Sequence, residues 1–285
     1  MSMTVAFQGA PGAYSDLALR RRLGAVTTLP CRTFEEVFSA LADARATHAF
    51  IPIENSIAGR VADIHHLLPN SGCAIIGEHY EPIHHQLLGV PGATLADVTH
   101  VHSHVHALGQ CRDYIAAREL TAIVHADTAG AAADVAVWQD PSKAAIASEL
   151  AGERYGLTVL ASDIEDHEHN TTRFLLLSPE PVPYPDSDRA VITTILFTLR
   201  SVPAALYKAI GGFATNGINL TKIESCLTGE HFSVAQFYID VAAHPDSVGM
   251  QHALEELRFF SHEVRIMGCY EASRFREHRE VTAKE

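Results

Sequence analysis

Short apolar runs alternate with amphipathic stretches along the first 178 residues of the chain. The apolar runs, often bounded by Gly, Pro or Asn, predict buried strands, and apolar residues at helical spacing predict helices between them. Strands interleaved with helices indicate an α/β fold class. We expect strands at Thr4–Phe7, Ala25–Leu29, His48–Ile53, Cys73–Tyr80, Pro82–Gly89, Val98–Val101, Leu120–His125, Leu157–Ala161 and Arg173–Leu177, and helices at Ser15–Leu23, Phe34–Ala44, His104–Ala117 and Thr128–Val137.

The pattern changes after residue 190. One strand, a helix that starts near Pro203, two strands joined by a tight turn, a second helix and a last strand follow in that order. This βαββαβ order predicts a ferredoxin-like unit. The expected strands are Val191–Leu199, Ile218–Cys226, Ser233–Val241 and Val264–Tyr270, the turn is Thr228-Gly229-Glu230, and the helices present Leu206, Ile210 and Phe213, then Met250, Ala253, Leu254 and Leu257, on one face.

A proline-rich segment separates these two patterns. Ser178–Arg189 holds four prolines among twelve residues, together with several acids. Prolines stiffen such a segment, and few of its residues can join a core. The sequence therefore predicts a first domain over residues 1–180, a linker over 181–190, a second domain over 191–272 and a polar tail over 273–285.

Composition narrows the functional classes. The 285 residues are 47% apolar and 19% charged, as in ordinary globular proteins, and the net charge is −13. No block of Lys or Arg stands out, which argues against nucleic-acid and membrane partners because both select basic surfaces. The chain shows neither a signal-peptide pattern nor an apolar run of about 18 residues, so we expect a cytoplasmic protein.

The five cysteines lie far apart and form no C-x-x-C pair. This spacing favours reduced, mostly buried thiols over a disulfide framework or a cysteine-based zinc site.

Polar, small-residue turns follow several of the expected strands. They read "GAPGAYSD", "IENSIAG", "HSHVHALGQC" and "ADTAGAA", and each offers a helix N-cap: Ser15, Asn55 or Ser56, Ser103, and Asp127 or Thr128. Each one taken alone is explained by simple capping. In open α/β sheets, however, strand ends and helix starts face one crevice, where free backbone N–H groups can bind an anion without Lys or Arg.

Several other chemistries find little support. Gly9-Ala-Pro-Gly12 is not a dinucleotide fingerprint, and both the phosphate-binding loop and G-x-S-x-G are absent. His100, His102, His104 and His106 alternate and raise zinc as an alternative, and further imidazoles come from His65-His66, His84-His85, His167 and His169. The strand that carries the alternating set is, however, expected to end near Ser103. We therefore interpret these histidines as surface or capping residues and expect no metal.

The stretch "HNTTRFLLLSP" joins a polar cluster to an apolar run, Phe174–Leu177. One interpretation is a strand that delivers its polar half into the crevice, with Arg173 clamping a carboxylate and Thr172 donating a hydrogen bond to a departing oxygen. The other is an edge strand whose polar groups cap neighbouring loops.

These segments resemble a known family. "NTTRFLLL" is similar to the N-x-T-R-F signature of prephenate dehydratase, and "GAYSDLAL", "IPIENSIAG", "SHVHALGQC", "DTAGAAADVA" and "AAIASELAGERYGL" resemble its other blocks, in order. Residues 191–272 resemble the ACT regulatory domain that follows in these enzymes. The resemblance implies two α/β lobes similar to periplasmic binding proteins, and conversion of prephenate to phenylpyruvate with loss of CO2 and water, in phenylalanine biosynthesis, without a cofactor.

The resemblance also assigns residues. Thr172, Asn55 and Gln110 are the implied catalytic residues. From their place at the expected crevice, we also predict substrate contacts from Arg173, Phe174, Ser15, Tyr14, Ser56, Ser103, His104 and Thr128. The predicted phenylalanine contacts are Ala205, Leu206, Asn219, Leu220, Glu224 and Ser225.

The regulatory segments depart from the family pattern. Pro203-Ala-Ala-Leu206 stands where the family has a G-A-L-V-like segment, and Glu224-Ser-Cys-Leu227 stands for E-S-R-P. A second domain kept chiefly for dimerisation is the alternative to a phenylalanine sensor, and we expect a homodimer or tetramer. For the whole chain, the competing functions are an arogenate dehydratase, a non-catalytic amino-acid sensor, and a histidine-dependent metallohydrolase acting on esters, lactones or amides.

Overall fold

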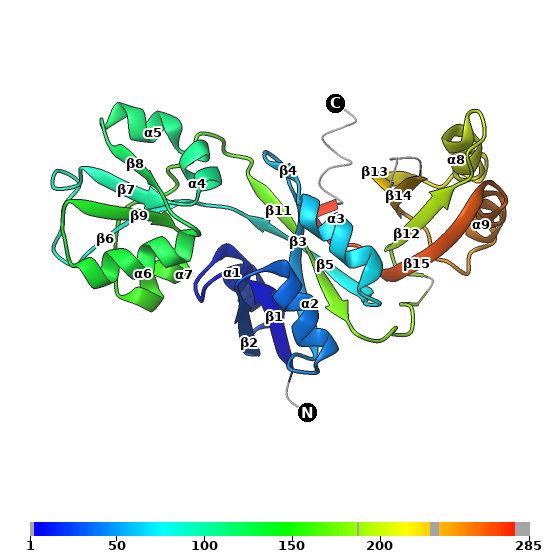
Figure 1. Ribbon diagram of the computed structural model, residues 1–285, viewed down its shortest axis with the longest axis horizontal. Coiled ribbons are helices and arrows are strands. Elements are labelled where there is room, and N and C mark those ends of the chain that lie inside the picture. The colour runs from blue at the N-terminus through cyan, green and yellow to red at the C-terminus, as the bar shows by residue number, and fades with distance from the viewer. Residues whose placement is uncertain (1–2, 187, 229–233, 277–285) are drawn as a thin grey trace. The chain divides into compact units, whose positions relative to one another are not determined.

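The computed structural model describes residues 3–186, 188–228 and 234–276 (Figure 1). Its contacts divide the chain into two compact units. The first unit holds the residues up to Val61 together with His79–Phe174, and the second holds Ala62–Glu78 and the residues from Leu175 onwards. The division passes through two strands, β5 (Ala74–Pro82) and β11 (Thr171–Ser178).

One sheet has the order β2-β1-β3-β11-β5, with a short strand, β4, paired to β3. Strand β1 lies between β2 and β3 and runs parallel to both. Val5, Ala6 and Phe7 are fully buried, as expected for a parallel strand covered on both faces. The bounds are Thr4–Gln8 for β1, Thr27–Cys31 for β2, His48–Asn55 for β3, Gly59–Arg60 for β4, Tyr14–Leu23 for α1 and Phe34–Ala42 for α2.

A second sheet has the order β10-β6-β9-β7-β8. Its central strand β9 is parallel to β7 and antiparallel to β6, and its residues Ala144–Ala147 are fully buried. The bounds are Gln86–Gly89 for β6, His100–Ser103 for β7, Thr121–Val124 for β8, Lys143–Ala147 for β9, Thr158–Ala161 for β10, Val105–Gln110 for α4, Arg112–Ala117 for α5, Thr128–Trp138 for α6 and Glu149–Tyr155 for α7. The predicted α/β class, built as two lobes, is confirmed.

The helix predicted over His104–Ala117 is in fact two helices that meet at Cys111. The Asp166 carboxylate stabilises this break, because it accepts the backbone N–H groups of Arg112 at 2.8 Å and Asp113 at 3.1 Å. A carboxylate in this position caps a new helix start, so α5 begins there. Elements β4, β9, α3 and α7 were not predicted.

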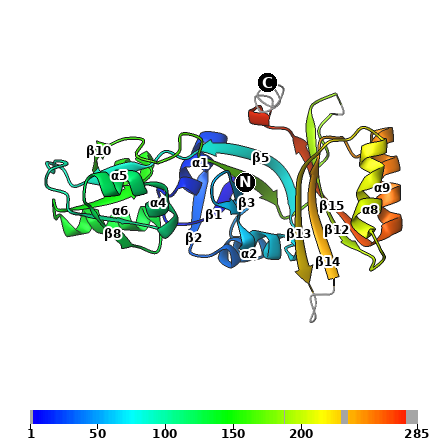
Figure 2. The same cartoon turned by 90° about the horizontal axis from the view of Figure 1, so that it is seen from above.

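The second unit contains the βαββαβ segment, in the predicted order. Its antiparallel sheet has the order β13-β14-β12-β15, and Figure 2 shows α8 and α9 together on one face. Phe197, Phe213, Phe237, Ile239 and Leu257 form part of the core between them. The bounds are Ala62–Leu67 for α3, Leu68–Asn70 for η1, Val191–Leu199 for β12, Ala205–Thr215 for α8, Leu220–Thr228 for β13, Val234–Val241 for β14, Val248–Phe260 for α9 and Ser261–Glu271 for β15.

Some predictions fall on parts of the chain that the structure does not describe. Gly229 and Glu230 of the predicted turn, Ser233 at the predicted strand start, and residues 277–285 of the predicted tail are among them. Cys31, Cys73, Cys111 and Cys269 are buried and free, and the Cys226 side chain lies outside the description. No helix in the described ranges is long and apolar enough to span a bilayer.

Gly268 on β15 generates a stability prediction. A Cβ atom at this position would lie 1.9 Å from the backbone oxygen of Ile75, in the same unit. A methyl group can be accommodated only if one backbone moves, so we expect Gly268→Ala to lower the free energy of unfolding by about 3 kcal/mol in urea denaturation.

Gly211 in α8 provides the matched control, because a Cβ atom there meets nothing within 4 Å. Gly211→Ala should raise the free energy of unfolding by about 1 kcal/mol, since Ala favours a helix more than Gly does. Equal effects of the two substitutions would contradict the close approach at Gly268.

Candidate active site

A cavity of about 290 Å³ lies in the first unit where strands end and helices begin. Helices α1, α4 and α6 all direct their N-termini toward it. None of the described residues that line it is a Lys or Arg. The lining residues are Gln8, Gly9, Ala13, Tyr14, Ser15, Pro52, Asn55, Ala58, Val61, Ile83, His85, His104, His106, Ala107, Gln110, Ala126, Asp127, Thr128, Thr172 and Phe174.

The cap of α1 differs from the prediction. The N-cap residue is Ala13, which has no side-chain cap, and Ser15 lies in the first helical turn. The first backbone N–H groups of a helix have no partner inside it, so those of Tyr14 and Ser15 need an external acceptor. No side chain caps them, and a helix start of this kind can accept an anion. The Asp16 carboxylate in the same turn accepts the Gly12 N–H at 2.9 Å and is paired with Arg20.

The other two helix starts carry their own caps. His104, and not the predicted Ser103, caps α4, with Nδ1 accepting from the backbone N–H of His106 at 3.3 Å. Ser103 is fully buried, and its hydroxyl donates to the Ile146 carbonyl. Asp127, one of the two predicted residues, caps α6 by accepting from the Gly130 N–H at 2.6 Å.

The carboxamide of Asn55 organises one wall of the cavity. Its Oδ1 accepts the backbone N–H groups of Ile57 at 2.9 Å and Ala58 at 2.8 Å, in the turn that leads to β4. This fixes the orientation of the amide, because only an oxygen can accept both bonds. Its Nδ2 donates to Thr172 Oγ1 at 2.9 Å and to Asn170 Oδ1 at 2.7 Å.

The direction of these bonds fixes the Thr172 hydroxyl as well. Because Oγ1 accepts from Asn55, its own hydrogen is available for another acceptor, and no group among the described residues takes it. Thr172 lines the cavity and is only 9% exposed. The structure thus presents a desolvated O–H donor to whatever occupies the cavity.

The network continues on the other side of Asn170. Its Nδ2 donates to Gln110 Oε1 at 3.0 Å, and the same oxygen is 2.8 Å from His85 Nε2. A carbonyl oxygen cannot donate, so His85 Nε2 carries the hydrogen, and in the neutral ring Nδ1 is the acceptor. Tyr14 OH lies 2.6 Å from that Nδ1.

The two titratable groups of this network are held neutral. Burial lowers the pKa of His85, and the Gln110 hydrogen bond opposes this only in part. Burial also raises the pKa of Tyr14 well above its usual value, and the nearby Cys111 and Glu165 act in the same direction. The network therefore orients donors without adding a charge to the cavity.

Arg173 does not reach the cavity, contrary to the prediction. Alternate residues of a strand face opposite sides, so Thr172 and Arg173 cannot share the crevice. The Arg173 side chain is 1% exposed and donates to Glu54 Oε1 at 3.1 Å. Phe174, on the same face as Thr172, does line the cavity, and its ring stacks on Phe50 at 4.9 Å.

Ser56 and Ser103 are also absent from the lining. Ser56 Oγ donates to the His169 carbonyl at 2.9 Å and accepts from the backbone N–H of Thr171, so it joins two loops. The predicted residues that the structure does bring to the cavity are Thr172, Asn55, Gln110, Phe174, Tyr14, Ser15, His104 and Thr128.

Sequence reasoning missed His85, and also Gln8, His106 and Asp127 as lining residues. His85 falls within the predicted strand Pro82–Gly89 and lies just before the observed strand β6, but this position alone does not reveal its partners. The alternating histidines do not converge: β7 ends at Ser103 as predicted, His102 packs against Trp138 at 4.8 Å, and His104 and His106 turn to the cavity.

The predicted phenylalanine contacts lie in the second unit. Ala205 and Leu206 open α8, and Asn219 and Leu220 stand at the start of β13. Glu224 is partly buried and accepts from Lys222 Nζ at 3.3 Å, and Ser225 is exposed.

The prephenate dehydratase family model matches residues 5–182. A bifunctional N-acyl-homoserine lactone acylase/prephenate dehydratase from Komagataeibacter europaeus is 48% identical over 272 residues, which cover 95% of this chain and 97% of that protein. Chloroplastic arogenate dehydratase/prephenate dehydratase 1 from Arabidopsis thaliana is 39% identical over 280 residues, which cover 93% of this chain and 71% of that protein.

Two solved structures superpose on nearly the whole length of this chain. GqqA, described as a novel type of quorum quenching acylase, superposes with a TM-score of 0.90 at 47% identity and covers 96% of this chain and 99% of its own. Prephenate dehydratase from Arthrobacter aurescens in complex with L-Phe gives a TM-score of 0.86 at 29% identity and covers 99% of both chains. Because both the family model and these relatives span the cavity-forming residues, the chain belongs to the prephenate dehydratase family of lyases.

Proposed function

We propose that the protein converts prephenate to phenylpyruvate, CO2 and water in the cavity of the first unit. The ring carboxylate leaves as CO2, and the electrons of its C–C bond move through the ring and expel the hydroxyl group at the opposite carbon. The reaction consumes one proton, which the departing hydroxyl takes up to leave as water. Formation of the aromatic ring drives the step, so the enzyme has to bind the dianion and assist the leaving oxygen.

The Thr172 hydroxyl is the observation that carries this proposal. Asn55 donates to its oxygen at 2.9 Å, which leaves the hydroxyl hydrogen for the departing oxygen of the substrate. A donor that is fixed before the reaction stabilises charge that develops in the transition state without reorganisation. Asn55 and Gln110 act here by orienting that donor and the substrate.

The pyruvyl carboxylate of the substrate is assigned to the start of α1. Its first N–H groups have no side-chain cap, and the Ser15 hydroxyl lies beside them in the lining. The start of α6 is a poor alternative, because the Asp127 carboxylate already accepts its Gly130 N–H and repels a second anion.

Loss of the ring carboxylate as CO2 is faster if no strongly charged side chain binds this group. Pro52, Val61, Ile83 and Phe174 give the cavity apolar walls, and the described lining contains no Lys or Arg. An ion pair would stabilise this carboxylate in the ground state and lose that stabilisation as CO2 forms. Apolar walls therefore favour decarboxylation over tight binding.

The pair Thr172→Val and Thr171→Val tests the role of the hydroxyl. Both substitutions exchange a hydroxyl for a methyl group on the same strand, but only Thr172 lines the cavity. Thr172→Val should lower kcat for phenylpyruvate formation roughly 100-fold or more, as expected for loss of one such donor, while Thr171→Val leaves kcat near the wild-type value.

Equal kcat values for the two variants would contradict the assignment. Absence of any phenylpyruvate from wild-type protein would favour a sensor that binds without turnover. Arogenate carries an amino group where prephenate has its keto group, and kcat/KM on the two substrates in the same assay decides which one is the substrate.

A second activity is favoured by the 48% identical relative, whose name includes N-acyl-homoserine lactone acylase. His104 lines the cavity with Nδ1 engaged as the cap of α4, which leaves Nε2 as its second ring atom. Burial lowers the pKa of His104, and the neighbouring His106 acts in the same direction, so the ring is neutral at pH 7. We propose that it accepts a proton from water that adds to the acyl carbonyl, and returns it to the departing amine of homoserine lactone.

Crossed variants test this hydrolysis. Purified protein is incubated with an N-acyl-homoserine lactone, and the released fatty acid is measured by mass spectrometry. His104→Gln should lower the hydrolysis rate by roughly 100-fold, because glutamine cannot act as a base, while Thr172→Val retains it. If the wild type releases no fatty acid, or if both variants lose activity equally, the proposal is wrong.

Phenylalanine is the proposed effector of the second unit. The support is the related prephenate dehydratase structure that contains L-Phe, together with Glu224, which is partly buried at the predicted position. A carboxylate there suits the ammonium group of the ligand, and Lys222 at 3.3 Å orients it.

Calorimetric titration with phenylalanine should show one site per chain. Glu224→Gln should weaken binding at least about tenfold, because it removes a charged hydrogen-bond acceptor, whereas Glu255→Gln on the exposed face of α9 should not. No binding heat, and kcat/KM for prephenate that phenylalanine leaves unchanged, would instead favour a domain that serves only the association of chains.

A further inference from the structure

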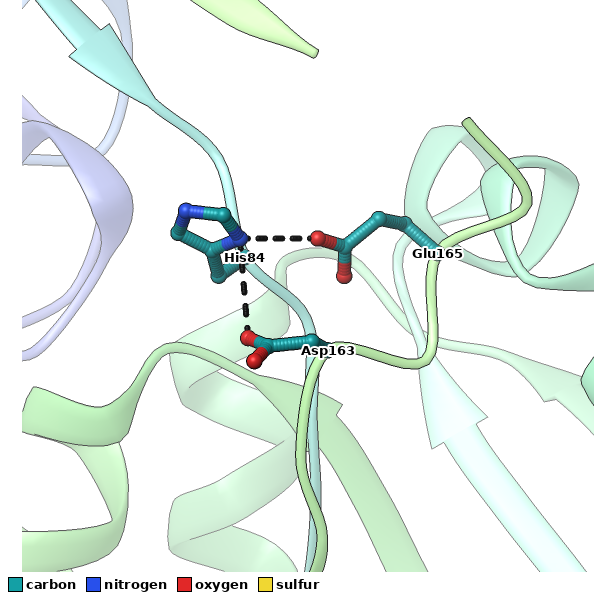
Figure 3. A group of neighbouring side chains, drawn as sticks. All are labelled: His84, Asp163 and Glu165. Carbon is teal, nitrogen blue, oxygen red and sulfur yellow. Dashed lines mark hydrogen bonds and ion pairs between the residues drawn. The ribbon is translucent and has the colours of Figure 1, made fainter. Parts of the chain in front are cut away.

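His84, Asp163 and Glu165 form a compact cluster outside the lining of the catalytic cavity (Figure 3). His84 Nδ1 lies 2.8 Å from Glu165 Oε1 and 3.5 Å from Asp163 Oδ1. All three potential ligand atoms lie within 4.8 Å of one another. Figure 3 shows the two carboxylates meeting the same nitrogen from different directions.

One proton on His84 Nδ1 cannot form a good hydrogen bond to both carboxylates. Nδ1 can carry only one hydrogen, yet two carboxylate oxygens approach it. These carboxylates also accept two uncharged donors: the backbone N–H of His85 donates to Glu165 Oε2 at 2.8 Å, and Gln86 Nε2 donates to Asp163 Oδ1 at 3.3 Å. Neither donor is charged, so the cluster keeps an excess negative charge even when the imidazole is protonated.

A small divalent cation matches the spacing. Zinc bonds of about 2.0–2.2 Å to nitrogen and oxygen place tetrahedral ligand atoms roughly 3.3 Å apart. The two His84 separations of 2.8 and 3.5 Å bracket that value, and all three atoms lie within 4.8 Å of one another, so rotations of the exposed His84 and Asp163 side chains would close the set around one ion. Because one donor is an imidazole nitrogen, the set favours zinc or cobalt over magnesium and calcium, which prefer oxygen.

The ligands are also held in different ways. The Glu165 side chain is only 5% exposed, and its second oxygen is fixed by the His85 N–H. His84 and Asp163 are 49% and 66% exposed, which leaves access for an ion and for water as a further ligand. One anchored ligand beside two accessible ones suits a site that takes up an ion from solution.

The cluster joins the two chain segments that link the sheets of the first unit. His84 lies between β5 and β6, and Asp163 and Glu165 lie between β10 and β11. Two backbone hydrogen bonds already connect these segments, from Ile83 N to Asn170 O at 2.8 Å and from Ile164 N to His85 O at 3.0 Å. A bound ion would add a further and stronger cross-link between these two segments.

We propose that His84 Nδ1, Asp163 and Glu165 bind a zinc-class divalent ion that ties together the two interlobe connections. Binding displaces the Nδ1 proton, and water completes the coordination. The site is structural rather than catalytic, because its three ligands do not line the cavity. It acts on the cavity through adjacent groups: the His84 carbonyl is 3.1 Å from Tyr14 OH, and His85 follows in the chain.

The test uses the full-length protein after treatment with EDTA. Zinc is titrated calorimetrically into wild type, His84→Ala, Asp163→Asn and the control His252→Ala, whose side chain is exposed on α9. The wild type and the control should each show one site that both cluster variants bind at least about tenfold more weakly. Saturating zinc should raise the thermal midpoint of wild type and control, but not of the cluster variants.

If His84→Ala fails to fold, Asp163→Asn still tests the site, because the Asp163 side chain is mostly exposed and its replacement should not disturb folding. Cobalt is a second probe, since coordination by nitrogen and oxygen gives a visible d–d spectrum that Asp163→Asn should remove. Equal zinc affinity and stoichiometry in wild type and both variants would overturn the proposal. An equal rise of the thermal midpoint with magnesium would also overturn it, because it would reduce the effect to nonspecific charge attraction.

Discussion

The carboxamide of Asn55 is the interaction on which the rest of the site depends. Its oxygen accepts two backbone N–H groups of one turn, so its nitrogen has to face Thr172 and Asn170. From that single orientation, the direction of each further bond follows through Gln110 to His85. Because backbone donors fix the first member, the amides of Asn170 and Gln110 in this network are not free to reverse. A network with one permitted direction is pre-organised, and it presents the Thr172 hydrogen to the cavity at no cost in reorganisation.

The alternation of β11 sorts its polar residues into two roles. Thr172 faces the cavity, whereas Arg173 points to the other side and pairs with Glu54. A buried guanidinium beside the reacting carboxylate would bind the substrate more tightly but slow its decarboxylation. The strand thus carries a charged anchor into the protein interior while it keeps the cation out of the catalytic cavity. The ion pair links β11 to Glu54 on β3, on the side of the strand opposite the Thr172 hydroxyl.

Much of the fold and part of the site could be predicted from the sequence. The runs around Phe7 and Phe50 are apolar throughout because their strands are covered on both faces, and so they are easily recognised. Strand β9 was missed because Ala144–Ala147 carries no strand preference of its own and owes its conformation to β6 and β7. The break between helices α4 and α5 at Cys111 depends on a hydrogen bond to Asp166. The burial of the Arg173 side chain depends on Glu54, which is 119 residues away in the sequence. Motifs identified Thr172 and Asn55, but His85 entered the site through partners 25 and 71 residues distant. Such contacts exist only once the chain has folded.

The distribution of charge around the cavity explains how an acidic protein can process a dianion. With a net charge of −13, the chain repels its substrate at long range, so attraction has to be local. Each helix start supplies about half a positive charge. Asp127 accepts the Gly130 N–H at the start of α6, whereas Asp16 in the first turn of α1 accepts the Gly12 N–H at 2.9 Å and is paired with Arg20, so the first N–H groups of α1 keep no side-chain cap. In the proposed reaction this gradient treats the two carboxylates of prephenate differently. The one at α1 is held by fixed N–H dipoles, while the one on the ring faces apolar walls from which loss of charge as CO2 is favourable. A cavity lined evenly with cations would bind both groups and stabilise the ring carboxylate before the reaction, which would slow its loss as CO2.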